Sequence, residues 1–290
     1  SEVSWVAVVP RSTILPAMSL AIATWNINSV RLRIDNVRRY LRLRKPDVLC
    51  LQETKTEDSL FPSVEIANAG YQSVFAGQKT YNGVAIVVRK AALASLATDH
   101  ETSFLKTTRN IPNFEDEQQR ILAATVCFNG MQPLRIISAY FPNGQSPDSD
   151  KFVYKLAWIN ALQEWLTSEM MQHPQLALLG DFNIAPTDVD VHDPKAWEGQ
   201  NLVSPEERDA FQGLIDLGFH DSYRLFEQLP KSFSWWDYRM MGFRRNAGVR
   251  IDHVLLTDAL KEECIASRID KVPRGWEQPS DHAPVITTLG

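Results

Sequence analysis

The order of apolar and polar residues predicts short strands separated by amphipathic helices. Apolar runs of about four to eight residues between turn signals are typical of buried strands. Asn82-Gly83 and Asn129-Gly130 are tight-turn signals between neighbouring runs. The predicted strands are Ala21–Trp25, Asp47–Leu51, Gln72–Ala76, Val84–Val88, Ile121–Phe128, Leu134–Tyr140, Gln175–Leu179, Val249–Leu256 and Pro284–Thr288.

Helical spacing occurs in three stretches, Arg31–Arg44, Phe152–Met170 and Pro205–Leu217. The second is the clearest, because Ser149 or Asp150 can cap it and one face is apolar. That face consists of Phe152, Leu156, Ile159, Leu162, Leu166 and Met170. Hairpins mixed with crossover helices, and no linker rich in Pro or Gly, predict one α/β domain with mixed sheets over residues 20–290. Residues 1–19 are interpreted as an N-terminal extension, since Pro10 and Pro16 interrupt their apolar stretch and Met18 is a possible start.

Several polar side chains stand where an apolar run ends. These are Asn26 and Asn28, Gln52 and Glu53, Asp181 and Asn183, and Asp281 and His282; Asp252 instead lies inside its run. A single Asp at a strand end is more often a turn residue than a catalyst, and a single His is more often structural. Together they predict an oxygen-rich pocket, if these ends converge. Such a pocket suits Mg²⁺ or Mn²⁺ with phosphate, whereas zinc would require more His and Cys.

Composition and net charge exclude few classes of binding partner. The net charge of -5 does not favour nucleic acid, but a total hides local patches. Basic residues do cluster at 31–45 and again at Arg239, Arg244, Arg245 and Arg250. For the first cluster a solvated outer helix face is the better interpretation, with Arg31 as its DNA contact. Cys50, Cys127 and Cys264 fit no metal spacing, and an odd, low count favours a reducing, cytoplasmic setting.

Eight motifs in a fixed order resemble the exonuclease III family of DNA-repair nucleases, within the endonuclease/exonuclease/phosphatase superfamily. They are ATWNINS, CLQETK, YNGVAIV, SAYFPNG, GDFNIAPTDVDV, FSWWDYR, GVRIDHVLL and PSDHAPV, between Ala21 and Thr288. The resemblance implies a four-layer α/β sandwich, with two mixed sheets face to face between helices. It also implies a Mg²⁺-dependent phosphodiesterase that acts on damaged or broken duplex DNA.

The same resemblance implies a role for each matching residue. The implied metal site contains Asn26, Glu53, Asp181, Asn183, Asp281 and His282, while Asn28 stands where many relatives have Asp. The implied catalytic set is Tyr140, Asp181, Asn183, Asp252 and His282. In it Asp181 is the base for water, Asn183 stabilises the transition state and Asp252 orients His282. The motifs do not decide between one metal ion and two.

The contacts expected with DNA come partly from loops and partly from aromatic side chains. The loop and backbone contacts are Lys55, Tyr81, Asn82, Gly83 and Arg239, with Trp235 and Trp236 as aromatic ones. By resemblance, Trp235, Val249 and Ile251 could line an apolar pocket for a baseless sugar. The segment 191–204 follows the Asp181 loop and is expected to gate that pocket in one direction or the other.

The leading interpretation is therefore a Mg²⁺-dependent repair nuclease. It would act as a 3′→5′ exonuclease, an abasic-site endonuclease or both, with 3′-phosphatase activity, and we expect a monomer without a membrane partner. A phosphodiesterase for a non-DNA substrate is the alternative within the superfamily. A non-catalytic DNA-binding member is a second one, and the presence of Glu53, Asp181 and His282 argues against it.

Overall fold

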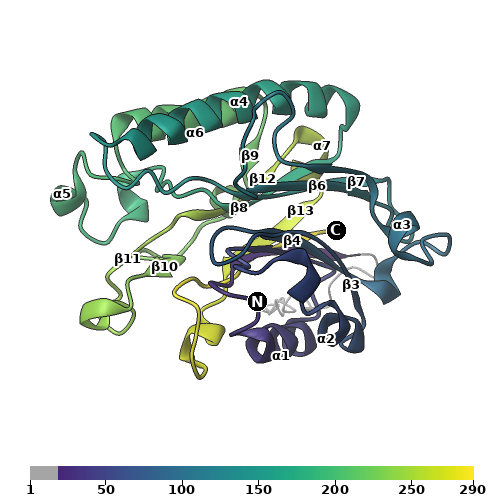
Figure 1. Cartoon of the computed structure of the whole chain (residues 1–290). Helices are drawn as coiled ribbons and strands as arrows, with labels where there is room; N and C mark the ends of the chain where they lie inside the picture. The colour runs from purple at the N-terminus through teal and green to yellow at the C-terminus, as the bar shows by residue number, and fades with distance from the viewer. Residues whose placement is uncertain (1–18) are drawn as a thin grey trace, which may run out of the picture.

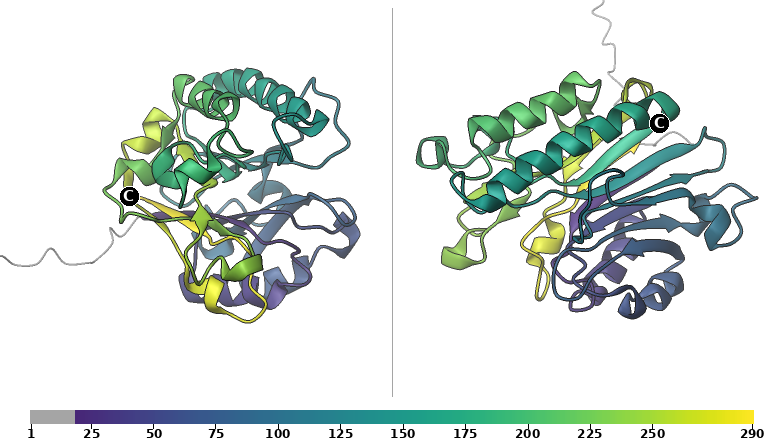
Figure 2. Two further views of the ribbon diagram at one scale, coloured as in Figure 1. Left: turned by 90° about the vertical axis from the view of Figure 1, so that its left-hand side faces the viewer. Right: turned by 45° about the horizontal axis from the view of Figure 1, so that its top comes forward.

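The structure is a computed structural model that describes residues 19–290. Two six-stranded sheets pack face to face, and helices cover the outer face of each (Figure 1, Figure 2). The first sheet has the order β13-β14-β1-β2-β4-β3, and the second has the order β5-β6-β7-β8-β12-β9. Within them β1 pairs with β2, and β7 with β8, in parallel, while the other pairs are antiparallel. The predicted four-layer sandwich is confirmed.

The strands of the first sheet are β1 (Leu20–Asn26), β2 (Val48–Gln52), β3 (Tyr71–Ala76), β4 (Val84–Arg89), β13 (Cys264–Ile269) and β14 (Val285–Leu289). Those of the second are β5 (Leu105–Arg109), β6 (Ile121–Val126), β7 (Leu134–Tyr140), β8 (Leu176–Asp181), β9 (His220–Asp221) and β12 (Asp252–Leu256). A separate two-stranded ribbon joins β10 (Trp235–Trp236) to β11 (Gly248–Val249).

Helices α1 (Ile34–Arg44) and α2 (Ser63–Asn68) cover the first sheet, and α4 (Asp150–Gln172) and α6 (Pro205–Asp216) cover the second (Figure 1). The short helices are α3 (His100–Ser103), α5 (Pro194–Trp197) and α7 (Asp258–Lys261). Ser149 caps α4 as predicted, since its Oγ accepts a hydrogen bond from the amide of Phe152. In the part of the chain that the structure describes, none of the helices has both the length and the apolar character needed to cross a membrane.

The core has three layers because both faces of each sheet are apolar. Side chains such as Ile22, Ile86, Ile136 and Leu179 fill the space between the sheets. The outer layers bury Val37 and Leu41 of α1, and Ile159, Leu162 and Leu166 of α4, against the sheets. Burial of this kind contributes about 1.5–3 kcal/mol per large apolar side chain, which holds the strand ends in fixed positions.

Two predicted segments differ from the structure, and one lies beyond it. The predicted strand Val249–Leu256 divides at Arg250-Ile251, where the chain passes from the ribbon into the second sheet. The apolar face of α4 includes Lys155, Trp158 and Glu169, while Leu156 is only half-buried. Residues 1–18 of the predicted extension lie outside the described residues.

Candidate active site

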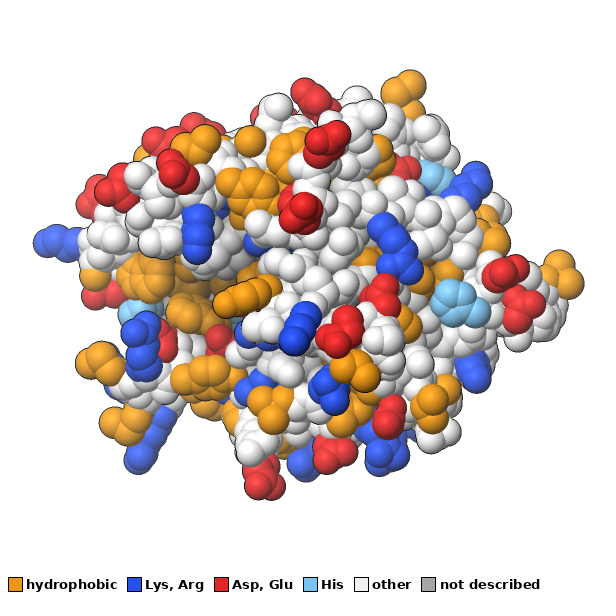
Figure 3. All heavy atoms as spheres, viewed as in Figure 1, with side chains coloured by type: hydrophobic (Ala, Val, Ile, Leu, Met, Phe, Trp, Pro, Cys, Tyr) orange, Lys and Arg blue, Asp and Glu red, His pale blue; other side chains and the backbone are white. Residues whose placement is uncertain are grey.

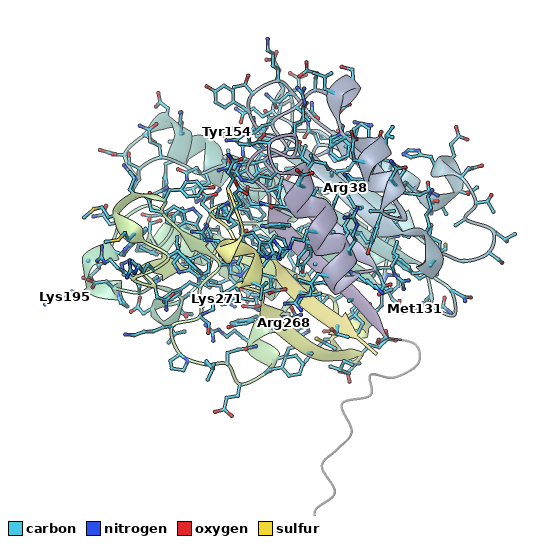
Figure 4. All side chains as sticks on the ribbon, turned by 90° about the horizontal axis from the view of Figure 1, so that it is seen from below. Arg38, Met131, Tyr154, Lys195, Arg268 and Lys271 are labelled. Atoms are coloured by element: carbon cyan, nitrogen blue, oxygen red, sulfur yellow. The ribbon has the colours of Figure 1, made fainter. Side chains whose placement is uncertain are left out.

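Strand pairing brings the polar strand ends together at one edge of the sandwich, from which the β10–β11 ribbon extends (Figure 1). Parallel pairing places Asn26 beside Gln52, and Tyr140 beside Asp181. Antiparallel pairing places Asp252 opposite Asp181, so Asp252 also begins a strand at this edge. Figure 4 shows the extent of the molecule along these strands. Met131, in the turn between β6 and β7, lies far from Lys195, in the segment that follows β8. The predicted convergence of the strand ends is present.

Gly180 stands inside β8, and its role is close packing. A Cβ atom there would lie 1.9 Å from the carbonyl oxygen of Ala139 on β7, which no side chain can tolerate. The strained backbone follows instead at Asn183, whose φ is 50°, and a matching strain occurs at Glu53, with φ also 50°. Non-glycine residues in this region cost on the order of 1 kcal/mol or more, and they cluster at functional sites.

A chain of three side chains forms the centre of the site. His282 Nδ1 lies 2.8 Å from Asp252 Oδ2, and its Nε2 lies 3.6 Å from Asp181 Oδ2. The three side chains are almost fully buried. Ser280 fixes the histidine backbone, since its Oγ accepts from the His282 amide and donates to the Asn26 carbonyl. The imidazole is therefore held in one orientation, with Nε2 directed toward Asp181.

Carboxylates set the charge of this histidine. Burial lowers the pKa of His282, but the charges of Asp252 and Asp181 outweigh it and raise the pKa well above its ordinary value. Burial also raises the pKa of Asp181, against the effect of the neighbouring His282. Tyr140 has a pKa well above its usual range because of burial and the nearby Glu53 and Asp181 carboxylates. The site thus presents an imidazolium and a phenol hydroxyl, both hydrogen-bond donors suited to phosphate oxygens.

Glu53, Asp181 and His282 have ligand atoms within 4.8 Å of one another. Asn26 organises this group rather than adding an oxygen to it. Its Nδ2 donates to Glu53 Oε2 at 2.5 Å and to Asp181 Oδ2 at 2.9 Å, while its Oδ1 accepts from the Asn28 amide. Two carboxylates held by one amide suit a hard divalent cation. In this arrangement the Asn26 NH₂ faces both carboxylates, and ligation of metal by Asn26 stays a prediction.

Asp281 lies beside the group and outside it. Its Oδ1 accepts from Asn28 at 3.3 Å, and its Oδ2 accepts from the indole nitrogen of Trp235 at 3.0 Å. Among the residues that the structure describes, the cluster of possible ligands excludes it. Asp281 therefore connects the ribbon to the site, and its predicted direct contact with metal does not match these hydrogen bonds.

A second pair of asparagines borders the site on the side of β7. Asn183 donates from Nδ2 to the Phe141 carbonyl at 2.8 Å, and its amide donates to Asp181 Oδ1 at 3.0 Å. Asn143 Nδ2 donates to Asn183 Oδ1 at 3.4 Å. Nearby, Arg120 lies 4.9 Å from the centre of the Tyr140 ring. Tyr140, Arg120 and Asn143 line a cavity of about 580 Å³ next to the carboxylates.

Two of the predicted loop contacts, Tyr81 and Asn82, line the same cavity. Lys55 Nζ donates to Asn28 Oδ1 at 2.8 Å, Tyr81 is 68% exposed, and Asn82 lines the cavity beside it. Gly83 is buried, with a φ of 94°, and its amide donates to Gln119. Arg239 is exposed and pairs with Asp237. Figure 3 shows a hollow with hydrophobic walls and basic side chains around it.

Two predicted DNA contacts are wrong because their side chains are buried. Trp236 has no exposed surface, and its indole nitrogen donates to Asn246. Arg250 is 1% exposed and forms ion pairs with Asp190 and Asp221. Arg244 and Arg245 are exposed, as a DNA-binding loop requires.

The predicted pocket for a baseless sugar is filled by this chain. Val249 and Ile251 are buried in an apolar cluster with side chains of the 191–203 segment, and Trp235 packs at its edge. Val191 forms a β-bridge with Val249, and the His192 amide donates to the Gly248 carbonyl. A cavity of about 800 Å³ is lined by Asp188, Val191, Trp197 and Arg208, and not by Val249 or Ile251. The segment therefore covers Val249 and Ile251.

Sequence reasoning missed two buried charges near the site. Lys155 on α4 donates to the Asn183 carbonyl at 2.7 Å. Asp190 accepts from Arg250 and Arg224, and these charges outweigh burial and lower its pKa to about 2. The signal for Lys155 was its position three residues after Phe152, on the apolar face. Asp190 lay within a quoted motif, but its partners stand 34 and 60 residues away.

Comparisons with known proteins agree with this geometry. The model of the endonuclease/exonuclease/phosphatase family matches residues 23–282. Exodeoxyribonuclease III of Haemophilus influenzae is 35% identical over 273 residues, which is 90% of this chain and 97% of that protein. A solved 3′ phosphatase from Neisseria, bound to a product DNA hairpin, has a TM-score of 0.86 and 40% identity over 93% of this chain and 99% of that one. An AP endonuclease from Archaeoglobus fulgidus has a TM-score of 0.83 and 33% identity over 93% of this chain and 99% of that one.

Proposed function

This chain belongs to the endonuclease/exonuclease/phosphatase family, and we propose that it is a Mg²⁺- or Mn²⁺-dependent phosphodiesterase of DNA base-excision repair. Its substrate would be duplex DNA with a damaged 3′ end or an abasic site. The observation that supports this most directly is the Asp252–His282–Asp181 chain beside Glu53. The names of the relatives support the same reaction class, since they are exonucleases, AP endonucleases and a 3′ phosphatase.

In the proposed reaction, the residues of this chain bind the phosphate and move one proton. His282, held as a cation by Asp252, would bind a non-bridging phosphate oxygen, with Asn183 as a second donor. Asp181 would accept the proton of the attacking water as general base. Tyr140 would donate to phosphate or to the leaving oxygen. The hydrogen bond of the Asp252 side chain goes to the histidine, so its part would be to set the orientation and charge of His282.

Glu53, together with Asp181, would hold the divalent cation. Their carboxylates face one another across the Asn26 amide, which matches the preference of Mg²⁺ for a site with one or two carboxylates. A bound cation would neutralise charge that develops on the phosphate. His282, already paired with Asp252, is assigned to phosphate and not to the metal.

Among the possible activities, we propose that processing of 3′ ends predominates over incision at internal abasic sites. The support is the 191–203 segment, which packs over Val249 and Ile251 where an extruded sugar was expected. A terminal nucleotide requires no such pocket. We also propose that residues 20–290 act as one monomeric catalytic domain in the cytoplasm, since both sheets contribute to the site and the three cysteines are free.

Two end-labelled duplexes test this function in Mg²⁺, with EDTA controls. One carries an internal abasic analogue, and the other is intact with a recessed 3′ end. The expected result is a ladder from the 3′ end with little internal cleavage. A single cut 5′ to the abasic site, without shortening of the other duplex, would overturn the preference for ends. Failure to cleave either duplex would favour another phosphodiester or a binding role.

A further inference from the structure

Lys155 is a fully buried cation whose three donors are all used. Its Nζ donates to the carbonyl of Asn183 at 2.7 Å, to the carbonyl of Asn143 at 3.3 Å and to Glu207 Oε2. The side chains of Lys155 and Glu207 have no exposed surface. One ammonium, which has three N–H donors, therefore joins the loop after β7, the loop after β8 and the first turn of α6.

We propose that Lys155 is a positioning residue for phosphodiester cleavage, with Glu207 as its counter-charge. Its ammonium would fix the backbone of Asn143 and Asn183, so that both amides face the phosphate. This role rests on the proposed function above, since it acts through Asn183. It gives α4 a part in the reaction through Lys155, which acts on the backbone of the two loops.

The backbone of Asn183 is where such support is required. Asn183 has a φ of 50°, a left-handed conformation that asparagine adopts more readily than other non-glycine residues but that the surrounding contacts must still select. Its amide and side chain are fixed by Asp181 and Phe141, and Lys155 binds the remaining polar group, the carbonyl. Strain of this kind persists only where surrounding contacts determine the conformation. Lys155 completes that set of contacts.

Stability alone does not account for this ion pair. Lys155 stands on the apolar face of α4 with Phe152 and Ile159 as neighbours, where an apolar side chain would suit the helix better. Replacing a buried ion pair by hydrophobic residues is often neutral or stabilising, because desolvation offsets the attraction. Glu207 has further contacts, since its Oε2 accepts from the Leu202 amide and its Oε1 accepts from Ser204 Oγ. The same carboxylate thus also fixes the end of the 191–203 segment.

The test removes the ammonium together with its counter-charge. The variant Lys155→Met with Glu207→Gln keeps an acceptor for Ser204 and leaves no buried net charge. The matched control is Arg135→Met with Glu169→Gln, a second buried pair that joins β7 to α4, with 3% and 6% exposure and a separation of 2.8 Å. For each, kcat and KM are measured on the duplex with a recessed 3′ end, alongside the thermal unfolding midpoint.

A positioning role predicts that kcat falls about 100-fold in the first variant, while KM changes less than about threefold. The control should retain wild-type kcat even where its unfolding midpoint drops. In an Asn183→Ala background the first variant should add little further loss, because both changes act on one unit. Equal kcat losses in the two variants, or full additivity with Asn183→Ala, would overturn the role.

A more conservative double variant is used if the first one does not fold. Lys155→Gln with Glu207→Gln keeps an NH₂ group on a shorter, uncharged side chain near the two carbonyls. An intermediate kcat is therefore expected, and an unchanged kcat overturns the role. Cleavage by the wild-type chain distinguishes failure of the proposed function from failure of the role of Lys155. If it cleaves none of the duplexes, the proposed function fails and this role with it. If it cleaves and the variants behave as the control does, only the role of Lys155 fails.

Discussion

His253 makes folding stability depend on pH through one buried ring. Its Nε2 donates to the Ile184 carbonyl at 2.9 Å, and its Nδ1 accepts from Arg250 at 3.1 Å. Phe182 and Phe211 pack edge-on at ring distances of 5.0 and 5.1 Å. This pattern fixes the neutral tautomer with the proton on Nε2. A second proton would have to enter at Nδ1, directly facing a guanidinium.

The pKa of His253 is consequently low. Burial and the charge of Arg250 lower it from 6.5 to about 4, and the carboxylates of Asp221 and Asp190 offset this only in part. In the unfolded chain the ring titrates near its ordinary value. Between those two values the unfolded state therefore binds a proton that the folded state does not, so stability is lost as the pH falls. The loss is about 2 kcal/mol by pH 5 and about 3 kcal/mol in full.

Urea unfolding monitored by tryptophan fluorescence measures this loss. The free energy of unfolding is compared between wild type and His253→Gln, which cannot titrate but keeps one donor and one acceptor. The variant should be less stable at neutral pH, and the difference should shrink by about 2 kcal/mol between pH 7 and pH 5. His220→Gln, at a part-exposed site beside Asp258, should keep the acid dependence assigned to His253. Parallel curves for wild type and His253→Gln would refute the reasoning.

Three further predictions concern the site itself. Asp181→Asn should reduce kcat about 10²–10⁴-fold while the Kd for duplex, measured by fluorescence anisotropy, stays within about threefold; retained cleavage would remove the assignment as base. EDTA should abolish cleavage, and added Mg²⁺ should restore it. Mn²⁺ should raise the thermal unfolding midpoint of the wild type but not that of Glu53→Gln. An equal rise in both proteins would mean that the ion binds elsewhere. Arg244→Ser with Arg245→Ser should reduce the steepness of log affinity for duplex DNA against log salt concentration by about 2. The control Arg42→Ser, on the outer helix α1, should leave this slope unchanged. An unchanged slope in the double variant would exclude phosphate contacts by Arg244 and Arg245.

Much of the architecture could be predicted from local patterns, because long apolar runs and one well-capped helix determine their own structure. The strands that escaped prediction are β5, β9, β10 and β13, for which the local signal is weak. β5, with the sequence LKTTR, is mostly exposed. β13 is an edge strand in which Ser267 is buried and Cys264 and Ile269 are half-buried against the core. Such strands are stabilised by the neighbour to which they pair, and that neighbour lies elsewhere in the sequence.

The side chains of the site could be identified, but not their hydrogen-bond partners. The sequence placed Asn26, Glu53, Asp181 and His282 at the ends of apolar runs, whereas their convergence was implied only by the family resemblance. The Asn28 amide donates to the oxygen of the Asn26 side chain, which leaves the NH₂ for the carboxylates. The position of that amide depends on the folded turn and could not be predicted from the sequence. For the same reason Asp281 was expected at the metal, whereas Trp235 and Asn28 bind it.

Buried ion pairs explain why counting cations along the chain overestimates the DNA-binding surface. Arg135 on β7, Lys155 on α4 and Arg250 just before β12 are each neutralised by a buried carboxylate. They add almost nothing to the field that a duplex meets. We therefore expect the attraction for phosphate to come from exposed groups, among them Arg244 and Arg245. Because the total charge is acidic, DNA binding should be limited to the part of the surface that carries such groups.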